Sequence, residues 1–282
     1  MSESVVKAPS KSVSLQTLKL PTVSQQGIKA LEMISAKDLE FKELESILSS
    51  DPMLVGILIK YANSPMYRRH VETTNVRQAL NLLGLDIVRS AILICTMRSY
   101  CEPSNPAKEM LWEKTKHLSL MAKLLARRTS RKFADEVELT AMMSEMGGFV
   151  LSTNFVDEYE TVVAQAKDKR IAIEDEEFYC FGLKRADVTA LTLEKLRLPQ
   201  ITLDVLDKYY KREVPDEVKT DTDRQLVILK LASVLIAYES KRELIKKDSL
   251  CLSLFEIAGL ADINIDWLMD AYATEIAKEV SF

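Results

Sequence analysis

Residues 51–67 read DPMLVGILIKYANSPMY, and QALNLLGLDIV follows at 78–88. Asp51 can cap the start of a helix, and Pro52 suits the first helical turn, where its missing N–H group costs nothing. Apolar residues then recur on one helical face with the spacing i, i+3, i+4, i+7, at Leu54, Ile57, Leu58 and Tyr61. Asn63 and Ser64, followed by a proline, are a helix stop signal.

The second string predicts two further helices. The first of them ends at Leu83 with Gly84 as its C-terminal cap, which is the usual role of glycine at this position. Asp86 can cap the next helix, which directs its apolar residues inward at Ile87, Ala91, Ile94 and Cys95. Periodicity alone therefore predicts three packed helices between residues 51 and 100.

The literal strings resemble the HDOD domain family, whose pattern looks like DPxLxxxLLrxANSxxY followed by a QAIxxLGxxxLR-like helix. The matching residues are Asp51, Pro52, Leu54, Leu58, Ala62, Asn63, Ser64 and Tyr67, then Gln78, Ala79, Leu80, Leu83, Gly84, Leu85 and Arg89. The resemblance runs from about residue 18 to about residue 277 and is strongest in the N-terminal third. It implies a two-lobed helical signalling module with an HD-type phosphohydrolase fold, in which the catalytic residues are often lost.

Composition agrees with an all-α protein and excludes several classes. The chain has 282 residues, 47% hydrophobic and 28% charged, with only seven glycines and long segments of 3.6-residue period. A net charge of −4 gives no electrostatic reason to expect DNA as a partner. No apolar run approaches the roughly 20 residues that span a bilayer, so no membrane partner is expected. The cysteines lack CxxC spacing, which fits a reducing cytoplasm.

The chain divides into a tail and two predicted lobes. Residues 1–14 read as a flexible N-terminal tail, 15–105 as an N-terminal lobe of five short helices, and 106–282 as a degenerate HD-like lobe. The segment EPSNP at 102–106 marks the break, because two prolines stand in five residues. In the second lobe, helices are expected at 108–128, 136–151, 157–169, 186–196, 200–211, 223–242 and 263–279.

The HD resemblance also locates a candidate site. Metal-dependent HD phosphohydrolases share a His, a His-Asp dyad and a later Asp, which hold the divalent metals that activate water against a phosphate ester. With Trp112 and Ala126 as anchors, the first ligand position falls on Lys114. The dyad falls on Ser144 and Glu145, in MMSEMGGFVL at 142–151. The remaining positions fall on Arg185, Tyr209, Tyr210 and Ser233.

These substitutions imply that the metal chemistry is lost, since only Glu145 could still ligate a metal and Lys114 would repel one. No metal, no cofactor and no enzymatic activity are therefore expected. The competing hypothesis is a metal-dependent phosphohydrolase, which rests on fold resemblance alone. A third hypothesis is that Lys114, Arg185 and the tyrosines form a cationic, aromatic pocket for a cyclic dinucleotide, another nucleotide or an anion. The alternative for the same residues is that they pair with Glu145 and fill the space that the metals vacated.

The favoured hypothesis is a non-catalytic bacterial regulatory protein that binds an unidentified signalling protein through the first lobe and its junction with the second. Asn63 is the residue to test, because its side chain can hydrogen-bond backbone groups across the turn to Ser64 and Tyr67. His117 is interpreted as a surface or hydrogen-bonded helix histidine, and His70 as exposed. The acidic run EDEE at 174–177 is interpreted as a solvated helix start.

Overall fold

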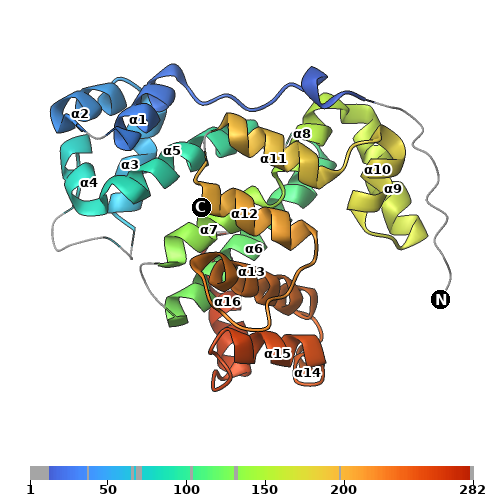
Figure 1. The fold of residues 1–282 in the computed structure, drawn as a ribbon. Helices are drawn as coiled ribbons and strands as arrows, with labels where there is room; N and C mark the ends of the chain where they lie inside the picture. Colours follow the sequence, from blue (N-terminus) through green and yellow to red (C-terminus); the bar gives the residue numbers. More distant parts are fainter. Residues whose placement is uncertain are drawn as a thin grey trace. The chain divides into compact units, whose positions relative to one another are not determined.

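The computed structural model describes residues 13–36, 38–64, 67, 72–101, 104–129, 133–196 and 198–279. Within these ranges every regular element is a helix, and no strand occurs (Figure 1). The prediction of an all-α protein is therefore confirmed.

The chain separates into two compact units, each of which is described by itself. The first unit comprises residues 21–102, and the second comprises residues 103–282 together with the segment that ends at Leu20. The division falls in the EPSNP segment. The sequence predicts that residues 15–20 belong to the first lobe. In the structure, their contacts group them with the second unit.

Five helices make up the described part of the first unit: α1 (Gln25–Ser35), α2 (Phe41–Ser49), α3 (Pro52–Ala62), α4 (Val76–Leu83) and α5 (Leu85–Tyr100). Helix α3 packs against α4 and α5, and α1 packs against α2 and α5. On α3, Leu54, Ile57 and Leu58 are buried, as the apolar periodicity predicts, whereas Tyr61, the fourth residue of the predicted face, is only half-buried. Burying a leucine or isoleucine side chain contributes roughly 1.5–3 kcal/mol, so this face supplies much of the unit's stability.

Helix α3 starts where the sequence indicates. The Asp51 carboxylate accepts the backbone N–H groups of Met53 at 3.0 Å and Leu54 at 3.4 Å. Its other oxygen accepts the Ser24 hydroxyl at 2.8 Å, and Ser24 itself caps α1. Asp51 therefore satisfies the free N–H groups of α3 and also ties the starts of α1 and α3 together.

The junction between α4 and α5 agrees with the sequence in one respect and differs in another. Gly84 follows α4 with φ +77°, a conformation that only glycine adopts without strain, and its N–H donates to the Leu80 carbonyl at 3.0 Å. Helix α5 begins at Leu85, one residue before Asp86. Asp86 thus lies within the first turn of α5 and not at the position before the helix, where the sequence predicts it.

Asn63 ends α3, but its side chain makes different bonds from those expected. Its amide nitrogen donates to the Thr73 carbonyl at 2.7 Å, and its amide oxygen accepts the Thr73 N–H at 2.8 Å. The sequence predicts bonds across the turn to Ser64 and Tyr67 and does not predict this two-way pairing, which arises because Thr73 runs beside the end of the helix. Asn63 therefore fixes the return of the chain to α4.

The described helices of the second unit are α6 (Pro106–Thr129), α7 (Ala134–Met143), α8 (Met146–Asn154), α9 (Val156–Lys169), α10 (Ile173–Phe181), α11 (Arg185–Lys195), α12 (Gln200–Tyr210), α13 (Asp221–Ala237), α14 (Arg242–Ile245), α15 (Ser249–Ile257) and α16 (Ile265–Glu279). Helix α6 is central, with contacts to α7, α8, α9, α13 and α16. Its buried residues Leu111, Leu118, Met121 and Leu125 recur at helical spacing, which explains how one helix joins so many neighbours.

Three expectations for this unit need correction. The helix predicted at 136–151 is two helices, α7 and α8, separated by Ser144 and Glu145. The helix predicted at 223–242 ends at Ala237, and the short α14 follows. The helix start predicted at 174–177 belongs to α10, whereas α15 was not predicted.

The segment before Pro21 is fastened to this unit. A short 3-10 helix covers Leu15–Thr17, and the Val13 N–H donates to the Phe181 carbonyl at 3.2 Å. The Asn154 side chain accepts the Lys19 N–H at 2.8 Å and donates to the Lys19 carbonyl at 3.0 Å. This pairing explains why residues 15–20 group with the second unit. Residues 1–12 of the predicted tail lie outside the described ranges.

The hydropathy of the helices agrees with the sequence. No helix in the described part of the chain is both long enough and apolar enough to cross a bilayer. Cys95 and Cys251 are buried among apolar residues, as plain core side chains would be.

Candidate functional site

Six of the seven positions that the HD resemblance selected line one cavity of about 860 Å³ in the second unit. They are Lys114 on α6, Glu145 between α7 and α8, Arg185 on α11, Tyr209 and Tyr210 on α12, and Ser233 on α13. The seventh, Ser144, reaches the site through its backbone, because its carbonyl accepts the Tyr210 hydroxyl. The positions that the HD resemblance selected therefore lie together in the fold, although they come from five different parts of the chain.

The break between α7 and α8 positions Glu145. The Ser144 hydroxyl donates back to the Ala141 carbonyl at 2.8 Å, which satisfies an acceptor at the end of α7. Glu145 then stands immediately before α8, with only 3% of its surface exposed. A carboxylate this deeply buried needs a charged partner.

Two glycines at the start of α8 allow that partner to approach. A Cβ atom on Gly147 would lie 2.4 Å from the Arg185 carbonyl oxygen, and one on Gly148 would lie 3.2 Å from the centre of the Arg185 guanidinium. A side chain at 147 would collide with the Arg185 backbone and one at 148 would be tight, so these glycines let α11 pack directly against α8 and insert Arg185 into the interior.

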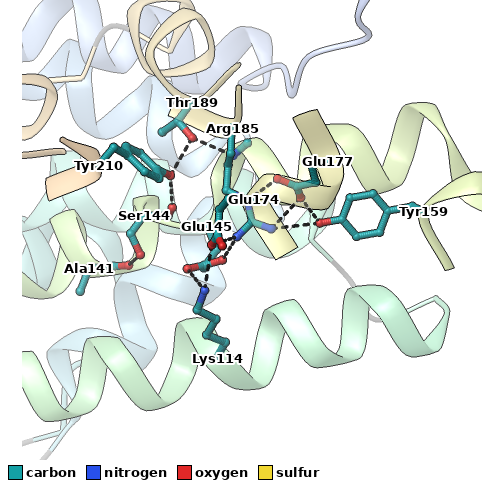
Figure 2. A network of polar contacts seen from close by, with 11 residues as sticks. Lys114, Ala141, Ser144, Glu145, Tyr159, Glu174, Glu177, Arg185, Thr189 and Tyr210 are labelled. Atoms are coloured by element: carbon teal, nitrogen blue, oxygen red, sulfur yellow. Dashed lines mark hydrogen bonds and ion pairs between the residues drawn. The ribbon is translucent and has the colours of Figure 1, made fainter. Parts of the chain in front are cut away.

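The guanidinium of Arg185 uses all five of its N–H donors within the protein (Figure 2). Nε and Nη2 bind the two oxygens of Glu177 at 2.9 and 2.6 Å. Nη1 binds Glu145 at 2.5 Å and Glu174 at 3.0 Å, and Nη2 also binds the Tyr159 hydroxyl at 3.2 Å. A guanidinium has no further donor, so Arg185 has none left for a ligand.

Lys114 completes this group, which we call the ion-paired cluster: Lys114, Glu145, Glu174, Glu177 and Arg185. The Lys114 ammonium lies 2.9 Å from Glu145 and 3.4 Å from Glu174. Its side chain is 46% exposed, so solvent weakens these two contacts. Three carboxylates face two cations, which leaves the fully ionised cluster with one net negative charge.

The pKa values follow from burial and from this charge balance. Burial disfavours the charged form of Arg185, but Glu177, Tyr159 and Glu145 outweigh it and hold the pKa of Arg185 well above its usual range. Burial raises the pKa of Glu177 more than the guanidinium lowers it. For Glu174 burial is opposed by Arg185 and Lys114, and the pKa is lowered.

A chain of hydrogen bonds runs along the other side of the break. The Tyr210 hydroxyl donates its one proton to the Ser144 carbonyl, so Thr189, 3.0 Å away, must donate to Tyr210. The Thr189 hydroxyl in turn accepts the Gly147 N–H at 3.0 Å. Burial raises the pKa of Tyr210, which keeps its proton in place. These bonds fix α12 and α11 to the turn that carries Glu145.

Tyr209 and Ser233 form a separate contact in the cavity wall. Burial raises the pKa of Tyr209, and a hydrogen bond with Ser233 offsets part of that rise. Lys230 lies over the Tyr209 ring, with its Nζ 5.5 Å from the ring centroid. The position that the resemblance assigned to the final metal-binding Asp thus holds a neutral hydroxyl bonded to tyrosine.

Comparison with known proteins agrees with this architecture. A family model described as HDOD domain matches residues 20–211, which is more than half of the chain. The chain belongs to the HDOD family. The matched part of this HDOD protein extends from the first unit to the end of α12, and α13–α16 follow it.

Solved structures share the fold. An HDOD domain protein of unknown function from Geobacter sulfurreducens is 20% identical, with a TM-score of 0.67 over 92% of this chain and 91% of that one. A protein from Shewanella amazonensis SB2B, named as a candidate phosphohydrolase, is 18% identical, with a TM-score of 0.65 and 90% of each chain covered. A protein from Marinobacter aquaeolei VT8, named as a candidate signal transduction protein, is 17% identical, with a TM-score of 0.64 over 95% of this chain and 58% of that one. No match was found among curated proteins. At these identities the likeness concerns the fold.

The residues of the HDOD site do not suit a divalent metal. Arg185 and Lys114 already occupy the Glu145 carboxylate, at 2.5 and 2.9 Å. A metal placed there would face two cations at close range. Among residues whose positions are described, no group of three or more His, Cys, Asp or Glu side chains is arranged to hold a metal ion.

The family-pattern residues of the first unit hold its backbone together. Asp51 and Asn63 make the bonds described above, and Pro52 occupies the first turn of α3. The Gln78 side chain accepts the Thr74 N–H at 2.9 Å, ahead of α4. The remaining members of the set are two buried apolar residues, Ala62 and Leu83, the cap Gly84, and Ser64, whose N–H donates to the Tyr61 carbonyl at 3.0 Å.

Two other sequence interpretations can be compared with the structure. His117 bonds the Tyr272 hydroxyl and lies 3.9 Å from Glu239, and it is not among the residues that line the cavity. His70 lies outside the described ranges. The interpretation of 174–177 as a solvated run is wrong for its last two residues, because Glu176 is 1% and Glu177 0% exposed.

Glu174, Glu177 and Tyr159 belong to the site, but sequence reasoning missed them. Glu176, although buried, pairs elsewhere, with Lys169 at 2.6 Å. In the structure Glu177 and Phe181, four residues apart, are both buried on one face of α10. Nothing local distinguished this face from a solvated one.

Proposed function

We propose that this HDOD protein is a non-catalytic signal-transduction protein that acts by binding another protein. The observation that carries the proposal is the ion-paired cluster. The position where the resemblance expects a metal-bound carboxylate instead holds Glu145 bound by Arg185 and Lys114. A site built this way has no free ligands with which to hold a metal that would activate water.

The names of the structural relatives divide between two functions, and the side chains favour one of them. One relative is named as a candidate phosphohydrolase and another as a candidate signal transduction protein. All five N–H donors of Arg185 are used within the protein, so its side chain stabilises the fold where a metal would otherwise bind. This supports the second function for this chain.

The first unit offers the surface that we assign to the partner. Ile28 on α1, Phe41 on α2 and Met53 on α3 are 42%, 52% and 62% exposed. The hydrogen bond from Ser24 to Asp51 joins the starts of α1 and α3, which brings Ile28 and Met53 to the same end of the unit. Exposed apolar side chains such as these suit an apolar segment of a protein partner.

The test is capture of the partner from the native bacterium with the full chain as bait. We expect Met53→Ser and Phe41→Ser to abolish recovery of a partner while leaving the melting temperature unchanged. Leu252→Ser is the matched control, because Leu252 is an exposed apolar residue of the second unit. If both first-unit variants retain the partner while Lys114→Ala loses it, binding belongs to the cavity, and the assignment of the surface is wrong.

A further inference from the structure

The cavity holds a second set of charged side chains that differs from the ion-paired cluster. We call it the unpaired cations: Lys184, Arg212 and Lys230. The side chains of Lys184 and Arg212 have no ion pair or hydrogen bond with any residue that the structure describes, and Lys230 contacts the ring of Tyr209. Three positive charges therefore line the cavity without an ion pair among the described residues, although the Glu145, Glu174 and Asp175 carboxylates line it too.

Two of these cations repel each other. Burial lowers the pKa of Lys230, and the charge of Arg212 lowers it further, against a smaller opposite effect of Glu213. Arg212 is held with φ +59°, in the left-handed region, directly after the end of α12. Arg212 and Lys230 both line the cavity, and two cations on one cavity are stabilised when an anion binds between them.

Apolar side chains line the same cavity and are left exposed. Ile171, Val214 and Leu250 are 37%, 40% and 48% exposed, although all three are large hydrophobic residues. Phe178, Val234 and Leu254 also contribute to the lining. A ligand that matched this cavity would carry a substantial apolar body together with its charge.

We propose that this cavity binds a small amphiphilic anion, with its carboxylate or phosphate head at Arg212 and Lys230 and its apolar body against Val214, Leu250 and Ile171. The volume of about 860 Å³ lies in the range of roughly 300–1,000 Å³ that small-ligand sites occupy. The ion-paired cluster cannot bind the head, because the donors of Arg185 are all used and the cluster carries a net negative charge. Arg212 and Lys230 lie beyond residue 211, where the family match ends.

The inference goes beyond the proposed function, and its test needs only the purified full chain. Binding of hexanoate, octanoate and decanoate is measured by titration calorimetry, with octyl phosphate as the phosphate arm and 1-octanol as the uncharged analogue. We expect each added methylene group to tighten binding by about fourfold, given the usual gain from its burial. We expect 1-octanol to bind at least about tenfold more weakly than octanoate or octyl phosphate, whichever head the site prefers.

Variants locate the head and the body separately. Lys230→Gln and Arg212→Asn each remove one positive charge, and asparagine tolerates the left-handed backbone at 212. We expect each to weaken octanoate binding by about tenfold without lowering the stability of the free protein. Leu250→Ser should weaken binding, whereas Leu252→Ser, two residues away and outside the cavity lining, should not. Lys195→Gln is the charge control on an exposed helix end.

The binding measurements test the proposed anion site independently of the proposed function. If no alkyl anion binds more tightly than about 1 mM, or if 1-octanol binds as tightly as octanoate, the inference is wrong. If binding occurs but Lys230→Gln and Lys195→Gln affect it equally, the site lies elsewhere and the assignment is overturned. Since no partner and no hydrolysis enter these measurements, a failure of the proposed function would leave their result unchanged.

Discussion

Cationic side chains in two regions of one cavity differ in whether they are ion-paired. In the ion-paired cluster, the buried guanidinium of Arg185 is bound by three carboxylates and a tyrosine. The unpaired cations form no ion pair with any residue that the structure describes. The sign of a side chain's charge therefore does not tell whether it binds a ligand; what decides is whether its donors are already used. Arg185 braces the fold, whereas Arg212 and Lys230 remain available.

The largest expected effect is the loss of this brace. Arg185→Met would leave the buried carboxylates of Glu177 and Glu145 without the guanidinium, and we expect the free energy of unfolding to fall by about 3–5 kcal/mol. Lys230→Gln, at the other set of cations, should change it by less than about 0.5 kcal/mol. Urea unfolding monitored by circular dichroism measures both.

A control sharpens this contrast. Adding Glu177→Gln to Arg185→Met removes one of the stranded charges, so the double variant should recover part of the lost stability. A loss below about 1 kcal/mol for Arg185→Met alone would show that the cluster is not a brace, and the contrast with the unpaired cations would collapse.

The next effect concerns the close approach that admits Arg185. Gly147→Ala places a Cβ atom 2.4 Å from the Arg185 carbonyl, a backbone atom that cannot move alone, and we expect a loss of about 1–3 kcal/mol. Gly56→Ala is the matched control, because a Cβ there meets nothing within 4 Å in helix α3. That substitution should stabilise the protein by about 0.5–1 kcal/mol. Equal effects of the two alanines in thermal unfolding would contradict the packing described for α8 and α11.

A smaller effect compares the two asparagines that pair with extended backbone, one in each unit. Asn63→Ala leaves the buried backbone of Thr73 without partners and should cost about 1–3 kcal/mol. Asn154→Ala breaks the equivalent bonds to Lys19, which solvent reaches, so about 0.5–1.5 kcal/mol is expected. Chemical denaturation of both variants gives the order. If Asn63→Ala loses its partner protein while its stability stays normal, Asn63 contributes to recognition and not to the turn.

The smallest effect is a pH dependence. The pKa values of Tyr159, Tyr209 and Tyr210 are all raised, mainly by burial. In the unfolded chain these tyrosines ionise near pH 10, so above that pH proton loss favours unfolding and stability falls as the pH rises. Tyr210→Phe removes one such group and should make the decline between about pH 9 and 11 shallower, as urea midpoints would show. An unchanged slope would mean that Tyr210 ionises normally in the fold.

Much of the first unit could be predicted, because its signals are local. Asp51, Pro52 and Gly84 act within a few residues of their own positions, and the apolar spacing of α3 fixes its buried face. The partner of Asn63 could not be predicted, since Thr73 lies ten residues away and the sequence does not show where the chain returns.

The site was predictable in its positions but not in its bonds. The HD resemblance selected six residues that line one cavity, yet the break at Ser144 and Glu145 carries no glycine or proline of its own. That break follows from tertiary contacts, chiefly Arg185, forty residues later. For the same reason the burial of Glu177 had no local signal, and neither did the approach of Arg212 to Lys230.

The most direct test of the central claim, that this HD-like site is an internal brace and not a metal centre, is a metal analysis paired with a hydrolysis assay. The full chain, produced with added manganese, iron, nickel and zinc, is analysed for bound metal and then incubated with nucleotides and a phosphodiester substrate. We expect far less than one metal ion per chain and no hydrolysis above the buffer rate. About one metal ion per chain, lost in Glu145→Ala together with hydrolysis, would contradict the account.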